Sequence, residues 1–191
     1  MHTDSPKRRL TKEARHEQLL DVARALIKEV GTDELTLAHI AVRAGVTKPL
    51  VYDHFGDRAG VLSELYRTFE ERQRTVLDEA LAQSANDLST TAQLVAEAYL
   101  SCCVAEGREL ADVVAALAGS PELAQLRREA EEAYLEKVQE ALAPFTKRLD
   151  AAALQAVIGA GDALAREVLA ERTSMQRAGA TLTAITIAIT N

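Results

Sequence analysis

Segment 35–58 constrains the fold of this chain most, because it predicts two short helices joined by a tight turn. Thr36 can cap the first helix, since its hydroxyl can accept a hydrogen bond from a free first-turn N–H. Gly45 stands at the turn, where a left-handed backbone suits a residue without a Cβ. Thr47 can cap the second helix, and Pro49 suits its first turn, where a missing N–H leaves no bond unmade. The segment therefore predicts a helix-turn-helix.

The register of the second helix decides which side chains face outward. Val51 and Phe55 are four residues apart and share the inward face. A short helix with a polar outer face is what a DNA-binding protein lays in the major groove. The sequence thus predicts double-stranded DNA as a partner. The outward residues are Thr47, Lys48, Pro49, Tyr52, Asp53 and His54.

The segment resembles the N-terminal DNA-binding domain of the tetracycline-repressor (TetR) family of transcriptional regulators. The resemblance implies a repressor that binds a palindromic operator as a homodimer and is released by a small lipophilic effector. Two residues depart from the family pattern: Pro49 replaces a small or polar residue, and Asp53 turns an acid toward the groove, where it can accept from a cytosine amino group. The resemblance spans about Leu19 to Leu65 and rests on Thr36, Ile40-Ala41, Ala44-Gly45-Val46, Leu50 to Phe55, and Arg58 with Leu62.

Each outward residue has an expected contact on DNA. Thr47 and Tyr52 suit base edges or methyl groups, and Lys48 suits a guanine or a phosphate. His54 and Arg58 suit phosphates, Arg58 because it opens the next helix, whose N-terminus attracts anions. Three of these residues have competing interpretations. Tyr52 could be a core tyrosine, and His54 could lie beside the final carbonyls of its helix. Thr36 could serve only as a helix cap. The predicted DNA-binding set is Thr36, Thr47, Lys48, Pro49, Tyr52, His54 and Arg58.

Apolar periodicity along the whole chain predicts an all-α protein of about nine helices. The first helix spans about 11–30. Its inner face is expected to carry an apolar stripe of Leu19, Ala23, Leu26, Ile27 and Val30. A long fourth helix is capped by Asp57, polar residues 83–90 form a loop, and a fifth helix over about 91–106 ends at Gly107. Ser120-Pro121 starts the seventh helix, and the eighth begins near Ala151.

The segment 185–190 is ambiguous. Its residues alternate with period 2 and are β-branched, which locally favours a strand. Nothing else in the chain would pair with that strand, so its backbone groups would stay unbonded. We therefore predict a ninth helix with Leu182, Ile185 and Ile189 as its stripe.

These helices are expected to form an N-terminal three-helix DNA-binding domain over residues 1–58, and a C-terminal helical bundle over residues 59–191 for ligand binding and dimerisation. The resemblance implies a homodimer joined through the eighth and ninth helices. Small residues over 159–165 let helices approach closely, and the ninth helix is too apolar to face water. The alternative is that these small residues fit a tight monomer core.

Net charge opposes DNA binding at first sight, because it is −7. The distribution resolves this, since residues 1–58 hold 10 Lys and Arg against 9 acids, and residues 59–191 hold 12 against 20. The basic residues at the start of the chain can contact phosphates. The acidic segment 59–191 is expected to repel DNA and so disfavour binding in the wrong orientation. The bases at the start are Lys7, Arg8, Arg9, Lys12 and Arg15.

The resemblance places the effector site in the C-terminal domain, with the fourth helix as the lever. Plain core packing is the competing interpretation for each candidate lining residue. Asp162 stands out because it lies in the apolar segment AVIGAGDALA, where a carboxylate needs a partner. It can meet the effector, pair with Arg166 across the dimer, or turn to solvent. The predicted lining residues are Tyr99, Leu100, Cys103, Val113, Leu117, Tyr134 and Asp162.

The sequence favours neither an enzyme nor a bound cofactor or metal. All four histidines lie in the first 54 residues, and no nucleophile elbow, glycine-rich phosphate loop or metal-ligand spacing occurs. Adjacent Cys102 and Cys103 would strain the backbone if bridged, so a redox switch is disfavoured. No apolar run approaches a membrane span of about 20 residues and no secretory leader is present, so we expect a cytoplasmic protein without membrane contact. The alternative function is a helical small-molecule-binding or interaction protein without sequence-specific DNA binding.

Overall fold

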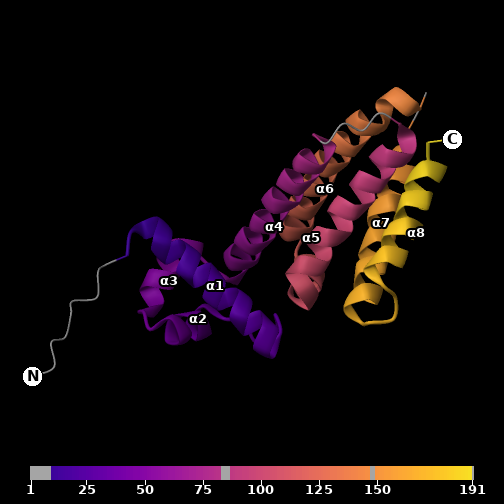
Figure 1. The fold of residues 1–191 in the computed structure, drawn as a ribbon. Helices are drawn as coiled ribbons and strands as arrows, with labels where there is room; N and C mark the ends of the chain where they lie inside the picture. The colour runs from indigo at the N-terminus through magenta and orange to yellow at the C-terminus, as the bar shows by residue number, and fades with distance from the viewer. Residues whose placement is uncertain (1–9, 83–86, 147–148, 191) are drawn as a thin grey trace, which may run out of the picture. The chain divides into compact units, whose positions relative to one another are not determined.

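The computed structural model describes residues 10–82, 87–146 and 149–190, and every regular element in these ranges is helical (Figure 1). The all-α prediction is therefore confirmed. Lys7, Arg8, Arg9 and residues 83–86 of the expected loop lie outside the described residues. The elements are α1 (Lys12–Val30), α2 (Leu37–Ala44), α3 (Lys48–Phe55), α4 (Arg58–Leu81), α5 (Leu88–Leu117), α6 (Pro121–Leu142), the 3-10 turn η1 (Ala143–Phe145), α7 (Ala151–Leu169) and α8 (Met175–Ala188).

Internal contacts divide the chain into two compact units, Met1–Glu64 and Leu65–Asn191. The boundary falls inside α4, so this one helix contributes residues to both units. The division expected between residues 58 and 59 lies at the start of the same helix.

The N-terminal unit is built on local signals. Thr36 accepts a hydrogen bond from the His39 amide at 3.1 Å, so the expected cap of α2 is confirmed, and Thr11 caps α1 in the same way by accepting from the Ala14 amide at 3.1 Å. Gly45 adopts the left-handed conformation (φ 67°, ψ 36°) that the turn between α2 and α3 requires. The core side chains at most 3% exposed are Leu19, Leu20, Ala23, Ile27, Leu35, Ile40, Ala41, Val51, Val61 and Leu62.

The C-terminal unit centres on α5, which packs against α6, α7 and α8 (Figure 1). Gly107 interrupts α5 with a non-helical backbone (φ 71°, ψ −157°), so the predicted boundary between a fifth and a sixth helix is a break within one element. The core of the C-terminal unit contains side chains that are at most 1% exposed, among them Leu77, Val95, Leu100, Leu117, Val138, Leu142 and Leu182.

Three expectations about element ends and faces were wrong. Val30 is 50% exposed and does not belong to the inner stripe of α1. Residues 88–90 are helical and not loop, because the carboxylate of Asp87 accepts from both the amide and the hydroxyl of Thr90 at 3.0 and 2.8 Å and so starts α5 early. Ile185 and Ile189 are only half-buried.

The end of the chain is helical, as expected, but in a different register. The buried face of α8 is formed by Ala178, Leu182 and Thr186. Thr186 donates to the carbonyl of Leu182 at 2.9 Å, so its hydroxyl is satisfied within the helix and the residue can be fully buried. In the described ranges, no helix is long and apolar enough to cross a membrane.

Candidate functional sites

The first candidate site is the outer face of α3. Val51 and Phe55 are buried, and Tyr52 is 45% exposed, which rules out the core-tyrosine alternative. The Lys48 ammonium lies 5.6 Å from the centre of the Tyr52 ring, within the range of a cation–π contact. Thr47, Lys48, Pro49 and Asp53 are exposed as well. The helix thus presents a continuous outer face that carries a cation, a phenol and a hydroxyl.

Two threonines beside this helix have different local roles. Thr36 is exposed and caps α2, and its hydroxyl can still donate to a second group while it accepts from the His39 amide. Thr47 precedes α3 with extended backbone but makes no capping bond through its side chain, so the cap expected from it is absent. The Thr47 hydroxyl is therefore available at the outer face.

His54 contacts α1. It is half-buried, and its Nδ1 lies 3.3 Å from the Nδ1 of His16. A hydrogen bond between two such nitrogens needs one of them to accept, so at least one of the two imidazoles is neutral. Burial first, and then the neighbouring His16, lower the pKa of His54. His54 is thus paired with α1 through Nδ1 and not with the last carbonyls of its own helix.

Arg58 has a structural bond that the sequence did not reveal. Its Nη2 donates to the carbonyl of Thr32 at 2.7 Å, and its Nε is buried without a hydrogen-bond partner among the described residues. The guanidinium therefore joins the start of α4 to the turn before α2. Thr32 lies 26 positions away in sequence, so no local pattern points to this contact.

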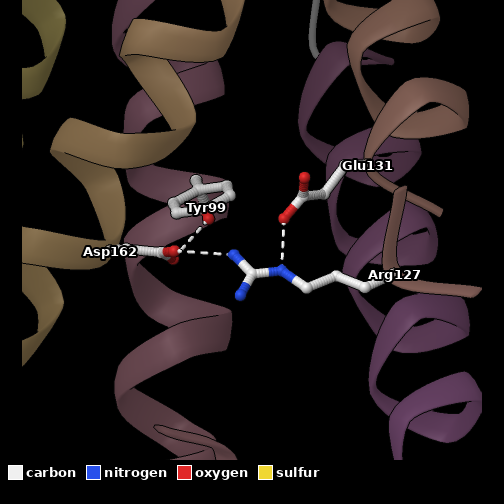
Figure 2. Close-up of polar contacts among 4 residues, drawn as sticks. All are labelled: Tyr99, Arg127, Glu131 and Asp162. Atoms are coloured by element: carbon white, nitrogen blue, oxygen red, sulfur yellow. Dashed lines mark hydrogen bonds and ion pairs between the residues drawn. The ribbon is translucent and has the colours of Figure 1, made fainter. Parts of the chain in front are cut away.

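The second candidate site is a cavity of about 30 Å³ inside the C-terminal unit, lined from α4, α5, α6 and α7. Figure 2 shows its polar centre, where the Tyr99 hydroxyl donates to Asp162 at 2.7 Å and Arg127 reaches the other oxygen of Asp162 at 3.4 Å. The Nε of Arg127 also donates to Glu131 at 2.6 Å. Asp162 is therefore paired with Arg127 within its own unit.

A glycine makes this meeting of helices possible. A Cβ placed on Gly161 would lie 2.5 Å from a ring carbon of Tyr99, a separation that real Cβ atoms do not adopt. Only glycine lets α7 pass this close to the Tyr99 ring, and that approach places the next residue, Asp162, against the Tyr99 hydroxyl.

Two further polar atoms on the cavity lack hydrogen-bond partners among the described residues. Glu70 is 7% exposed and Tyr134 is 2% exposed, and neither the Oε2 of Glu70 nor the hydroxyl of Tyr134 has a hydrogen-bond partner among the described residues. The other side of Glu70 is engaged by the Tyr66 hydroxyl. Burial raises the pKa of Glu70 and holds the pKa values of Tyr99 and Tyr134 well above their ordinary values.

An apolar groove of about 270 Å³ adjoins the cavity. The two share Cys103, Leu110, Val114 and Asp162. Cys103 and Cys102 are both free and buried, and burial raises the pKa of each thiol, which disfavours the reactive thiolate. The remaining lining of the groove comes from Gly107, Ala111, Ala115, Ala165, Arg166 and Leu169.

The predicted lining set divides in two. Tyr99, Cys103, Tyr134 and Asp162 line the cavity. Leu100, Val113 and Leu117 are buried but line neither the cavity nor the groove, because the helical period turns them to other faces of α5.

Sequence reasoning missed two acids and the base of the cavity, Glu70, Glu131 and Arg127. One signal could have found them: Tyr66, Glu70 and Gln73 on α4 repeat at i, i+4 and i+7, and Arg127 and Glu131 on α6 repeat in the same way with the predicted Tyr134. Polar and aromatic side chains at that spacing share one face of a helix, which makes a polar stripe toward the interior detectable.

Comparison with known proteins covers the two units unequally. Residues 19–65 match the sequence profile of the bacterial regulatory proteins of the tetR family. The HTH-type transcriptional regulator BetI of Cronobacter sakazakii is 34% identical over 82 residues, which are 43% of this chain and 40% of BetI. This chain thus matches about two fifths of the length of that relative.

Solved structures share the fold over nearly the whole chain. A TetR-like transcriptional regulator from Rhodococcus sp. RHA1 is 21% identical with a TM-score of 0.75, covering 93% of this chain and 96% of that one. The transcriptional regulator FadR from Bacillus subtilis, in complex with stearoyl-CoA, is 22% identical with a TM-score of 0.72, covering 90% of this chain and 97% of that one. These likenesses establish the arrangement of helices.

Proposed function

We propose that the chain is a member of the tetR family of bacterial regulatory proteins, which residues 19–65 match, and that it represses transcription as an effector-responsive DNA-binding protein. In this proposal, residues 1–58 bind a palindromic operator in double-stranded DNA, and residues 59–191 hold the effector and the dimer contact. The observation that carries the proposal is the outer face of α3, where Tyr52 is 45% exposed beside Lys48.

Each residue of that face has a proposed contact. Thr47 and Tyr52 read base edges or methyl groups in the major groove, and Lys48, oriented by the Tyr52 ring, takes a guanine or a phosphate. Pro49 holds the first turn, which fixes how the helix enters the groove.

The surrounding contacts are proposed to be with phosphates. Thr36 donates its hydroxyl while it caps α2. His54 donates an N–H as a neutral imidazole, in keeping with its lowered pKa. Arg58 contributes the part of its guanidinium that the Thr32 carbonyl does not engage.

A single helix-turn-helix covers few base pairs, so the proposal needs two copies about 34–36 Å apart. We propose that α7 and α8 form the dimer contact. Gly159 and Ala163 on α7, and Ala180 and Ala184 on α8, are small and exposed or half-exposed, which allows close packing of helices from a second copy. Met175 at the start of α8 is 37% exposed and adds apolar surface.

Release from DNA requires an effector that binds the DNA-incompetent arrangement more tightly than the competent one. We propose the cavity and its adjoining groove as the effector site. α4 supports this coupling, because Glu70 and Gln73 on it line the cavity while its first residue, Arg58, belongs to the N-terminal unit.

A second candidate function is a small-molecule-binding protein without sequence-specific DNA binding. The polar cavity favours it, since that site is complete within residues 65–191 and does not depend on α3.

Selection of bound duplexes from a random DNA pool separates the two functions. We expect the full chain to enrich a palindrome, and the variants Lys48→Ala and Tyr52→Ala to lose binding to it. Arg128→Ala removes an exposed cation from α6 and serves as the control that keeps binding. Failure to enrich any sequence, with all three variants behaving as the wild type, would refute the proposed regulator.

A further inference from the structure

The cavity of the C-terminal unit holds more acid than base. Its lining includes the carboxylates of Glu70, Glu131 and Asp162 against the single guanidinium of Arg127. Arg127 is already shared between Glu131 at 2.6 Å and Asp162 at 3.4 Å. The carboxylate of Glu70 is thus the one left in excess at the cavity. A site with this balance attracts a positive charge and repels a negative one.

The two unpartnered oxygen atoms of the cavity, on Glu70 and Tyr134, can both accept a hydrogen bond from a ligand. The Oε2 of Glu70 can only accept while the group is ionised, and the Tyr134 hydroxyl can accept or donate. Buried polar atoms without partners are rare because each one costs free energy, so two on one small cavity call for an explanation. A ligand group with several N–H donors and no acceptor satisfies both atoms, and an ammonium is such a group.

The dimensions of the site limit the ligand further. A volume of about 30 Å³ holds one group the size of a water molecule, which admits a primary ammonium and excludes a bulky headgroup. The adjoining groove of about 270 Å³ includes Arg166 but is otherwise lined largely by apolar residues, so it suits a slender apolar tail. These residues are Leu110, Ala111, Val114, Ala165 and Leu169. Tyr99 and Tyr134, whose ring centres are 5.6 Å apart, add aromatic surface that favours a cation.

We propose that the effector of this chain is a primary ammonium compound with an apolar tail, whose head is bound by Glu70, Tyr134 and Asp162 and whose tail lies in the groove. This inference rests on the proposed function, because it names the chemistry of the effector in that scheme.

Other apolar compounds fit less well. A carboxylate head would be buried among the acids, with Arg127 already paired, and an uncompensated buried charge is strongly unfavourable. A neutral alcohol would leave the excess carboxylate without a counter-charge. Burial raises the pKa of Glu70 in the empty site, and a bound cation would favour its ionised form again.

Calorimetric titration of the full-length chain with three probes of the same tail tests the proposal: octylammonium, octanol and octanoate. We expect octylammonium to bind at least about tenfold more tightly than the other two, because a hydrogen bond to a charged group is worth about that factor. Glu70→Gln should remove this preference, whereas Glu132→Gln, which removes an exposed acid from α6, should keep it.

Tyr134→Phe provides a second variant that removes one unpartnered hydroxyl and no charge. We expect it to weaken octylammonium by a smaller factor than Glu70→Gln and to leave octanol unchanged. Equal binding of octylammonium and octanol, tighter binding of octanoate, absence of binding by all three probes, or a cation preference that survives in Glu70→Gln would each overturn the proposal.

The selected duplex keeps the two proposals separable. If the chain binds that duplex and octylammonium does not bind the chain, the regulator stands and the effector class is wrong. If octylammonium binds with the expected preference and no duplex is enriched, the ammonium site stands and the regulator is wrong.

Discussion

The two units of this chain place their polar groups in opposite ways. In the N-terminal unit the core of α1 to α3 is apolar, and the polar side chains of α3 face outward. In the C-terminal unit the carboxylate of Glu70 and the phenol of Tyr134 are buried, and they line a cavity beside a half-buried, ion-paired arginine. A polar surface on a small helix suits recognition of a large partner, and an interior polar site suits a small molecule that leaves water. The predictions below test this contrast.

The largest expected effect is on DNA affinity alone. Lys48→Ala and Tyr52→Ala should each weaken binding of the selected duplex by about 1–3 kcal/mol per half-site, because each removes a groove or phosphate contact. Thermal unfolding and octylammonium binding should stay as in the wild type, since both residues are exposed. Fluorescence anisotropy with a labelled duplex measures the first effect, and a variant that also lost octylammonium binding would break the contrast between the units.

The next effect concerns the close approach of α7 to Tyr99. Gly161→Ala should lower the free energy of unfolding by about 1–3 kcal/mol, because its Cβ would collide with the Tyr99 ring. Gly159→Ala is the matched control on the same helix, where nothing lies within 4 Å of the added Cβ. Because Gly159 also belongs to the proposed dimer contact, both variants are compared at a concentration at which the chain is monomeric, and there Gly159→Ala should be neutral or stabilising. Urea denaturation followed by circular dichroism compares the two. Equal stability of both variants would contradict the packing described here.

The contrast also shows which features a sequence can reveal. The cap at Thr36 and the turn at Gly45 depend on residues a few positions apart, and both were predicted. The pairing of Arg127 with Asp162 joins residues 35 apart, and Glu70 meets them from a third helix. No local rule gives the packing of four helices, so the sequence marked Asp162 as costly but did not give its partner.

Register explains the remaining misses. Tyr99 and Asp162 were predicted to line an effector site, and both line the polar cavity. Leu100 was predicted to line the same site, but it follows Tyr99 directly and the helical period turns it to another face of α5, so it does not line the cavity. On α8 the sequence did not predict that Thr186 is fully buried, because threonine is usually exposed. Its hydroxyl donates to the Leu182 carbonyl, and this bond allows the residue to be buried.

A smaller effect links the interior acid to pH. Burial raises the pKa of Glu70, so the folded chain keeps this proton at pH values where the unfolded chain has released it. Its contribution to stability is therefore fully present below the ordinary pKa of a glutamic acid and is lost as the pH rises through the raised value. We expect Glu70→Gln to raise the Tm by about 2–4 °C at about pH 8 and to change it little at about pH 4. A lower Tm for the variant at the higher pH would show that the ionised carboxylate is satisfied in the folded chain.

The smallest effect has the opposite sign and belongs to the N-terminal unit. Burial and His16 lower the pKa of His54, so its contribution to stability is present above the ordinary pKa of histidine and is lost as the pH falls through the lowered value. Between about pH 7 and pH 5, the Tm of His54→Gln should therefore fall by about 1–2 °C less than the Tm of the wild type. His39→Gln, at an exposed site on α2, is the control that should follow the wild type. An equal fall in Tm for the wild type and both variants would show that the His16–His54 pair does not contribute to the pH dependence of stability.

We propose that α3 makes this chain a dimeric protein that recognises a specific DNA sequence. The most direct test is a titration of the selected duplex with the full chain across a range of salt concentrations, beside a scrambled duplex of the same length. We expect two chains to bind each duplex, the affinity to fall steeply with salt, and the scrambled duplex to bind at least about a thousandfold more weakly. Equal affinity for the two duplexes would contradict sequence-specific recognition, and one chain per duplex would contradict the dimer.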